Sequence, residues 1–307
     1  MPNSTTVTEF LLTRFSDELR VLHALLLLLM YLATLVGNLL IVILITFDWK
    51  LHTPMYFFIR NLSVLDMCYI SVTVPKACVI FLLDSTAISM AGCAAQLFLV
   101  VAFVTVELLF ITIMARDSYV AICQPLHYSV IMNPRVCVQM TLASVLSGLV
   151  HSGFQTGNTF RLSFCQSNMI HQFFCDLSSL LKLSCTDTLN NEILIFISSV
   201  VIAGGCFAFI IMSYIHIFST VLKFPTREAF STCVPHIIVL TIFVSSGAAV
   251  YVKPVSSSPT FQDTLSSVFY SVPPFLNPII YSLRNKQIKE AVNNLNSNLI
   301  RRCRELV

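Results

Sequence analysis

Long apolar segments alternate with short polar ones along the whole chain. A helix rises 1.5 Å per residue, so an apolar segment of about 20 residues crosses roughly 30 Å of hydrocarbon. The pattern predicts seven membrane-spanning helices, over residues 22–47, 54–83, 90–122, 136–154, 193–222, 229–252 and 265–283. The fourth segment is the least apolar, because Ser144, Ser147 and His151 interrupt it.

These segments predict an all-α fold, a single seven-helix transmembrane bundle over residues 22–283, preceded by an extracellular segment (1–21) and followed by a cytoplasmic tail (284–307). No internal period suggests a repeat architecture or a two-halved transporter. Apolar residues in the tail recur at spacings of three and four, which predicts a short amphipathic helix on the inner membrane surface, with a solvated tail as the alternative. They are Ile288, Ala291, Val292, Leu295 and Leu299.

Composition agrees with a membrane protein. Of the 307 residues, 56% are hydrophobic and 11% charged, and the mean hydropathy is +0.82, whereas soluble domains carry about 25% charged residues. No nucleophile, base and orienting group cluster together, so we do not expect an enzyme. Only two acids lie deep in the spans, which offers no charged pathway for a channel or transporter.

The distribution of Lys and Arg predicts the orientation. With the N-terminus outside, twelve of the 18 basic residues fall on the inner side, which favours a cytoplasmic C-terminus and a multi-pass plasma-membrane protein. Because these charges gather at the membrane face, a nucleic-acid partner is not indicated. The inner set is Lys50, Arg60, Arg116, Arg135, Lys223, Arg227, Arg284, Lys286, Lys289, Arg301, Arg302 and Arg304.

Two features suit an extracellular location. Asn3 begins an N-x-T glycosylation acceptor in the leading segment. Four of the eleven cysteines fall in predicted outer segments or at a span mouth, where an oxidising exterior favours disulfides. They are Cys93, Cys165, Cys175 and Cys185, and their three possible pairings stay open. Residues 155–192 hold three of them, which predicts a disulfide-tied lid over the outer mouth.

Two acids, Asp66 and Glu107, lie near mid-depth in the second and third spans. A lone carboxylate in hydrocarbon costs several kcal/mol, so each is expected to face the bundle interior. Together they predict a site for water or a structural sodium ion, the only cofactor we expect. Separate hydrogen-bonded structural roles are the alternative.

The seventh span contains the stretch NPIIY, from Asn277 to Tyr281. Pro278 interrupts the helical hydrogen-bond ladder, and the carbonyl that it frees needs a polar neighbour. A kink beside a buried polar cluster predicts a hinge between two packings of the bundle, with a static kink as the alternative.

Six motifs together resemble the vertebrate olfactory receptors of the tetrapod-type class, which are rhodopsin-like G-protein-coupled receptors. The match covers nearly the whole chain, in order. The motifs are LHTPMYFF (51–58), NLSVLD (61–66), MARDSYVAICQPLHY (114–128), SYIHIFSTV (213–221), AFSTCVPH (229–236) and NPIIYSLRN (277–285).

The resemblance implies specific sites. Cys93 would pair with Cys175, and Cys165 with Cys185. The two buried acids match those of the family, which favours the cation site. A small, mainly apolar odorant is the expected ligand, in a pocket near the outer side. The implied pocket residues are Val100, Val101, Val104, Thr105, Ser198, Ser199, Ile202, Gly247, Tyr251 and Tyr270. Switching and coupling to a stimulatory heterotrimeric G protein would involve Asp117, Ser118, Tyr119, Tyr214, Asn277, Pro278 and Tyr281.

The chain departs from the family at the inner end of the third span. The family reads Met-Ala-Tyr-Asp-Arg-Tyr, whereas Arg116 replaces the first Tyr here and Ser118 replaces the Arg. Two helical positions differ by about 200°, so Arg116 points away from the place of the missing Arg, toward the inner lipid interface. Other departures are Val145 for a Trp, Glu228 for a Lys and Val244 for an aromatic residue. The sequence thus predicts an odorant receptor with impaired coupling, or alternatively a degenerate receptor that only binds its ligand.

Overall fold

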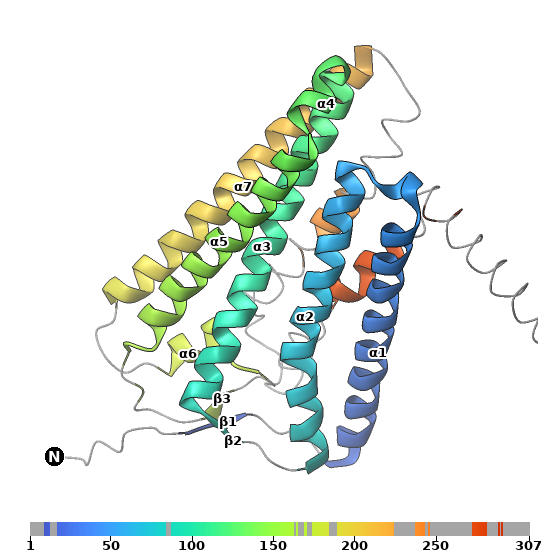
Figure 1. The fold of residues 1–307 in the computed structure, drawn as a ribbon. Helices are drawn as coiled ribbons and strands as arrows, with labels where there is room; N and C mark the ends of the chain where they lie inside the picture. Colours follow the sequence, from blue (N-terminus) through green and yellow to red (C-terminus); the bar gives the residue numbers. More distant parts are fainter. Residues whose placement is uncertain are drawn as a thin grey trace, which may run out of the picture.

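The computed structural model describes residues 9–12, 17–83, 87–162, 164, 169–170, 174–183, 189–223, 237–242, 245, 272–280, 288 and 290. Five long helices form a bundle (Figure 1). They are α1 (Asp17–Phe47), α2 (Pro54–Leu83), α3 (Met90–Cys123), α5 (Pro134–Thr159) and α7 (Leu189–Lys223). Within the described residues these five are long and apolar enough to cross a membrane, which confirms the first five predicted spans.

The sixth and seventh predicted spans lie largely outside the described residues. Their described portions, residues 237–242 and 272–280, are helical. The amphipathic tail helix and Asn3 also fall outside the description, apart from Ile288, which is buried, and Glu290.

The fourth span is longer than the hydropathy pattern predicts. Asn133 caps it by accepting a hydrogen bond of 3.0 Å from the backbone N–H of Val136, and Pro134 occupies the first turn, where its missing N–H costs nothing. The helix continues through polar residues to Thr159. Hydropathy detects only the apolar centre of such a helix, so the prediction omitted both ends.

Short elements connect the long helices: η1 (Trp49–Leu51), η2 (Pro125–His127), α4 (Tyr128–Ile131) and α6 (Leu177–Lys182). Three short strands form a sheet at the opposite end of the bundle from α4 (Figure 1). In this sheet β1 (Glu9–Leu12) lies between β2 (Ala87–Ser89) and β3 (Met169–Ile170), antiparallel to the first and parallel to the second. The hydropathy pattern does not predict this sheet, which joins the leading segment to the long segment before α7.

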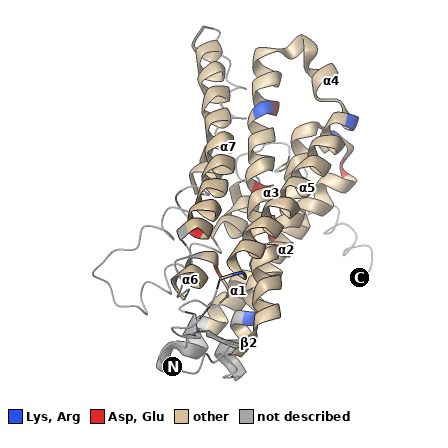
Figure 2. Cartoon of the chain, turned by 90° about the vertical axis from the view of Figure 1, so that its left-hand side faces the viewer, with Lys and Arg blue, Asp and Glu red and all other residues tan. Residues whose placement is uncertain are grey.

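The outer surface of the bundle suits lipid. Large apolar side chains on α1, α5 and α7 are exposed, among them Val36 (65%), Leu146 (64%) and Val201 (65%). Lys, Arg, Asp and Glu positions are sparse along the lengths of the described helices (Figure 2). Such a surface is unfavourable in water and expected in a bilayer.

Helix α3 lies at the centre of the bundle. Its most apolar window is 56% buried, against 17–28% for α1, α5 and α7. Phe110 of α3 packs against Phe58 of α2, with ring centroids 6.0 Å apart, inside a core that also takes in α1, α5 and α7. The disulfide, the two buried acids and the Asp117 site described below therefore all include α3 residues.

Small residues on α5 face α3. Ser144, Gly148 and Ser152, spaced four apart, are buried, and Ser152 donates a hydrogen bond to the carbonyl of Phe98. A Cβ atom added to Gly148 would lie 2.5 Å from Cγ2 of Val106. Close helix approach over small residues is common in membrane bundles, so the low hydropathy of the fourth span reflects this contact face.

Candidate functional site

A disulfide anchors α3 to the segment that follows β3. Cys93 is bonded to Cys175, as the resemblance implied, and both are fully buried. Gln96, one turn along α3, accepts a 3.0 Å hydrogen bond from the backbone N–H of Cys175 and donates one of 3.0 Å to the carbonyl of Val72 on α2. The segment is thus held to two helices. Cys165 and Cys185 lie outside the described residues.

Deeper in the bundle, a polar cluster joins α3, α5 and α7. His151 Nδ1 lies 3.1 Å from the hydroxyl of Thr105, and His151 Nε2 lies 3.0 Å from the side-chain nitrogen of Gln155. The same nitrogen is 2.9 Å from the hydroxyl of Ser198 and 2.8 Å from that of Ser199. We call these five residues the Gln155 cluster.

One atom of the Gln155 cluster lacks a partner. Gln155 is 1% exposed, and its side-chain oxygen has no hydrogen-bond partner among the described residues. The side-chain nitrogen also donates a 3.1 Å hydrogen bond to the carbonyl of Ile195, which sets the orientation of the amide and leaves the oxygen as the unmet group. A buried polar atom without a partner costs roughly 1–3 kcal/mol, so a water molecule or another donor at this oxygen would stabilise the site.

The structure divides the predicted pocket residues between two places. Thr105, Ser198 and Ser199 meet in the Gln155 cluster, whereas Val100 and Val104 pack with Tyr69 and Phe174. The remaining described members lie apart: Val101 packs near the disulfide, and Ile202 is half-buried on α7. Gly247, Tyr251 and Tyr270 lie outside the described residues.

Sequence reasoning did not select His151 or Gln155 as site residues. The prediction placed Gln155 at the start of the outer segment, which is wrong, because α5 continues to Thr159. Once both residues lie in one helix, their spacing of four puts them on one face.

The two buried acids meet at the NP motif. The side-chain nitrogen of Asn277 donates a 2.9 Å hydrogen bond to Oδ2 of Asp66 and lies 3.5 Å from Oε1 of Glu107. The three residues are between 1% and 6% exposed. Three oxygen-bearing side chains from three separate segments thus converge at one depth. In the arrangement seen here, the side-chain nitrogen of Asn277, and not its oxygen, faces the two carboxylates.

The carbonyl freed by Pro278 has the polar neighbour that the sequence predicts. Proline has no N–H, so the carbonyl of Pro274 lacks its helical donor. Asn38 of α1 donates a 3.1 Å hydrogen bond to this carbonyl, and a second of 3.0 Å to the carbonyl of Thr34. Gly37 leaves room for the contact, since an added Cβ would lie 3.2 Å from Cγ of Pro278.

At the other end of α3, Asp117 and Ser118 are buried while Arg116 is exposed. This agrees with the predicted outward direction of Arg116. The hydroxyl of Tyr128, in α4, donates a 2.9 Å hydrogen bond to Oδ1 of Asp117. Partial burial of Tyr128, and next the adjacent Asp117 carboxylate, raise the pKa of the Tyr128 hydroxyl, which keeps it protonated as the donor.

The remaining residues predicted to switch lie on facing helices. The ring of Tyr119 lies 5.9 Å, centroid to centroid, from that of His216 on α7. Tyr214, also on α7, is 7% exposed within the main core. Tyr281 lies outside the described residues.

Comparisons with known proteins agree with one family throughout. The model of the family described as "Olfactory receptor" matches residues 27–298. Human olfactory receptor 14C36 is 63% identical over 302 residues, covering 96% of this chain and 97% of that protein. Human olfactory receptor 14A16 is 49% identical with the same coverage. The crystal structure of squid rhodopsin, 17% identical, superposes with a TM-score of 0.69 over 94% of this chain and 88% of its own, which shows the shared fold.

Proposed function

The chain belongs to the olfactory receptor family, and from that premise we propose that it is an odorant receptor that binds a small, mainly apolar ligand within its bundle and signals through a stimulatory heterotrimeric G protein. Its topology would be that of a multi-pass plasma-membrane protein with the disulfide end outside and the Asp117 end in the cytosol. Family membership supports the general activity.

The Gln155 cluster carries the ligand proposal. It offers one unmet polar atom and two serine hydroxyls at the contact of α5 and α7, among largely apolar residues. A ligand hydroxyl can donate a hydrogen bond to the unmet Gln155 oxygen. We therefore propose a ligand class of small apolar alcohols. Val100, Val101, Val104, Ile202, Gly247, Tyr251 and Tyr270 stay as proposed apolar and aromatic contacts.

The test is an odorant panel that pairs alcohols with hydrocarbons of the same size, read as cAMP in cells carrying a receptor-trafficking chaperone. We expect alcohols to activate the receptor. Gln155→Leu is expected to raise the alcohol concentration needed for a half-maximal response about tenfold, the equivalent of roughly 1.4 kcal/mol. Gln139→Leu is the matched control, because Gln139 is exposed on the same helix. Equal responses to both chemical classes, or an equal loss in the control at matched surface expression, would contradict the proposal.

The Asp117 end supports a second candidate, a receptor that binds ligand but signals weakly. Ser118 is buried where the family usually carries an Arg, and the exposed Arg116 points elsewhere. A serine has neither the charge nor the length to move between Asp117 and a G protein. Ligand binding without cAMP would favour this candidate.

Asp66, Glu107 and Asn277 are the proposed sodium site, in which the carboxylates of Asp66 and Glu107 would supply oxygen ligands near the Pro278 hinge. Pro278 and Tyr281 would then link the state of the ion to the cytosolic end.

A further inference from the structure

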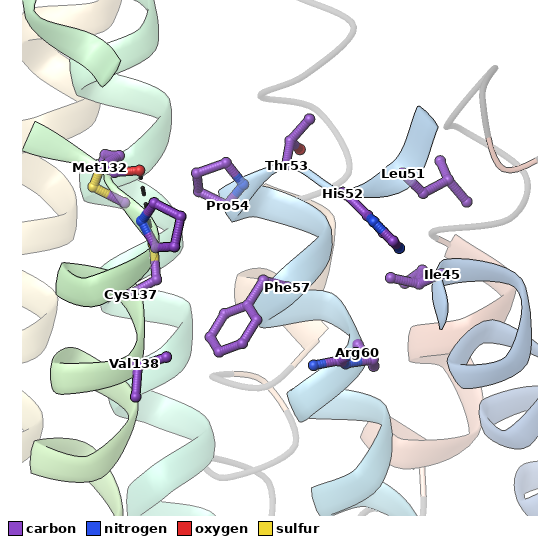
Figure 3. A pocket seen from close by; sticks show the side chains of 11 residues that line it. Ile45, Leu51, His52, Thr53, Pro54, Phe57, Arg60, Met132, Cys137 and Val138 are labelled. Carbon is purple, nitrogen blue, oxygen red and sulfur yellow. Dashed lines mark hydrogen bonds between the residues drawn. The ribbon is translucent and has the colours of Figure 1, made fainter. Parts of the chain in front are cut away.

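A cavity of about 300 Å³ lies between the start of α2 and the start of α5, well away from the Gln155 cluster along the bundle. The end of α1 and the turn after η1 complete its wall. Its lining is mainly apolar, and Figure 3 shows Phe57 and Arg60 of α2 on one side and Cys137 and Val138 of α5 on the other. The volume is at the lower end of the range of small-molecule sites.

Arg60 is the one Lys or Arg among the described residues that line this cavity. Arg60 lies six residues past Pro54, about 9 Å along α2, and is half-buried, with its guanidinium 5.6 Å from the centroid of the Phe57 ring. His52 is the other titratable side chain in the lining besides Cys137, and no Asp or Glu lines this part of the described chain. A guanidinium in apolar surroundings favours a planar or tetrahedral anion that accepts two of its hydrogen bonds.

The surroundings locate the cavity at the lipid headgroups. Trp49, the only Trp of the chain, is 76% exposed in η1, and Phe47 at the end of α1 is 82% exposed. Exposed aromatic residues at a span end mark the membrane interface. Arg60 lies about 9 Å along α2 from Pro54, so its long side chain has to extend toward this interface to meet a lipid phosphate.

We propose that this cavity binds an anionic phospholipid, with its phosphate on Arg60 and the beginning of an acyl chain against Phe57 and Val138. The cytoplasmic leaflet is rich in anionic lipids. This agrees with the proposed orientation, in which the Asp117 end of the bundle faces the cytosol. The occupied site joins α1, α2 and α5, so the lipid stabilises the contact among these helices.

The experiment uses the full chain in bilayer discs of phosphatidylcholine, with and without phosphatidylserine, and measures retained lipid by mass spectrometry and the melting temperature. We expect phosphatidylserine to be retained and to raise the melting temperature. Arg60→Gln is expected to weaken retention about tenfold, since it removes the charge-assisted hydrogen bonds to the phosphate. Arg116→Gln is the matched control, because Arg116 is exposed at the same end of the bundle and does not line the cavity.

A second variant, Val138→Trp, fills the cavity from α5 and leaves Arg60 in place. Val138 is 47% exposed, so the larger side chain does not have to fit a closed core. Loss of retention in this variant as well supports a lipid in the cavity. Equal loss in Arg116→Gln, equal retention of both lipids, or full competition by soluble glycerophosphoserine would each overturn the proposal, the last by showing a site for free anions.

Discussion

The hydroxyl of Tyr128 donates a 2.9 Å hydrogen bond to Oδ1 of Asp117, across the turn between α3 and α4. Asp117 is 3% exposed, so this bond satisfies an acid that water barely reaches. It also holds α4 against the end of α3, at the place where this chain lacks the usual Arg.

Removing that donor is expected to destabilise the receptor. Tyr128→Phe removes the hydroxyl that donates to the Asp117 carboxyl and is expected to lower the free energy of unfolding by about 1 kcal/mol. In a double-mutant cycle, Tyr128→Phe added to Asp117→Asn should cost less than Tyr128→Phe alone. Melting of the detergent-solubilised protein measures both, and additive losses would show that the two residues do not interact.

Restoring the family's residues is expected to restore coupling. Ser118→Arg combined with Arg116→Tyr should raise cAMP evoked by an activating odorant, because an Arg returns to the position beside Asp117. Cell-surface expression is matched by antibody labelling. The single variant Arg116→Tyr serves as the control and should leave the response low; an unchanged response in the double variant argues against Ser118 as the defect.

Sodium is expected to stabilise the protein through the two buried acids. At a sodium concentration ten times its dissociation constant, the stabilisation is about 1.4 kcal/mol, visible as a higher melting temperature than in choline at the same ionic strength. Asp66→Asn should abolish the difference. The control is Asp117→Asn, which changes a buried acid at the cytosolic end of α3 and should keep the difference between sodium and choline. If the melting temperature of the wild type does not depend on sodium, the proposed sodium site is wrong.

Gly148→Ala is expected to separate α3 from α5. The added methyl group would sit 2.5 Å from Cγ2 of Val106 and 3.1 Å from the carbonyl oxygen of Ala102, which costs about 1–3 kcal/mol by overpacking. Gly157→Ala on the same helix is the control, because its added methyl meets no atom within 4 Å. Thermal unfolding of both variants should show a lower melting temperature only for Gly148→Ala. Equal melting temperatures would mean that α3 and α5 accommodate the methyl group without loss of stability.

The second disulfide is a prediction for peptide mapping. Non-reducing digestion should yield a peptide linking Cys165 to Cys185, alongside the Cys93–Cys175 peptide that the structure contains. The latter is the internal reference for oxidation. Alkylated free thiols at Cys165 and Cys185 in the same digest would refute the pairing.

The sequence predicted those features that depend on apolar length and on single exceptional residues. Apolar length located the first five spans, and Asp66 and Glu107 were expected at one depth because each lies at a similar distance from its span end. The neighbour that Pro278 required was also predicted, but its identity was not. Asn38 lies far away along the chain, and nothing local indicates which of several polar residues reaches the freed carbonyl.

The Gln155 cluster shows where the pattern failed. The resemblance pointed to Thr105, Ser198 and Ser199 but not to the two α5 residues that connect them. His151 was predicted as an interruption of the fourth span, and Gln155 as part of the outer segment. Hydropathy averages over a helix and does not distinguish a face turned to lipid from one turned to a neighbour. The sheet was not predicted either. Its strands pair backbone groups that lie far apart in the sequence, and hydropathy carries no information about such pairing.

The bond between Asn38 and Pro274 has a consequence for biosynthesis. Its acceptor is made 236 residues after its donor, so α1 enters the membrane with an amide hydrogen directed at a helix that does not yet exist. A segment synthesised late thus completes the hydrogen bonding of α1. Products shortened before residue 274 keep Asn38 bonded only to its own turn and leave that flank of α1 open to other partners.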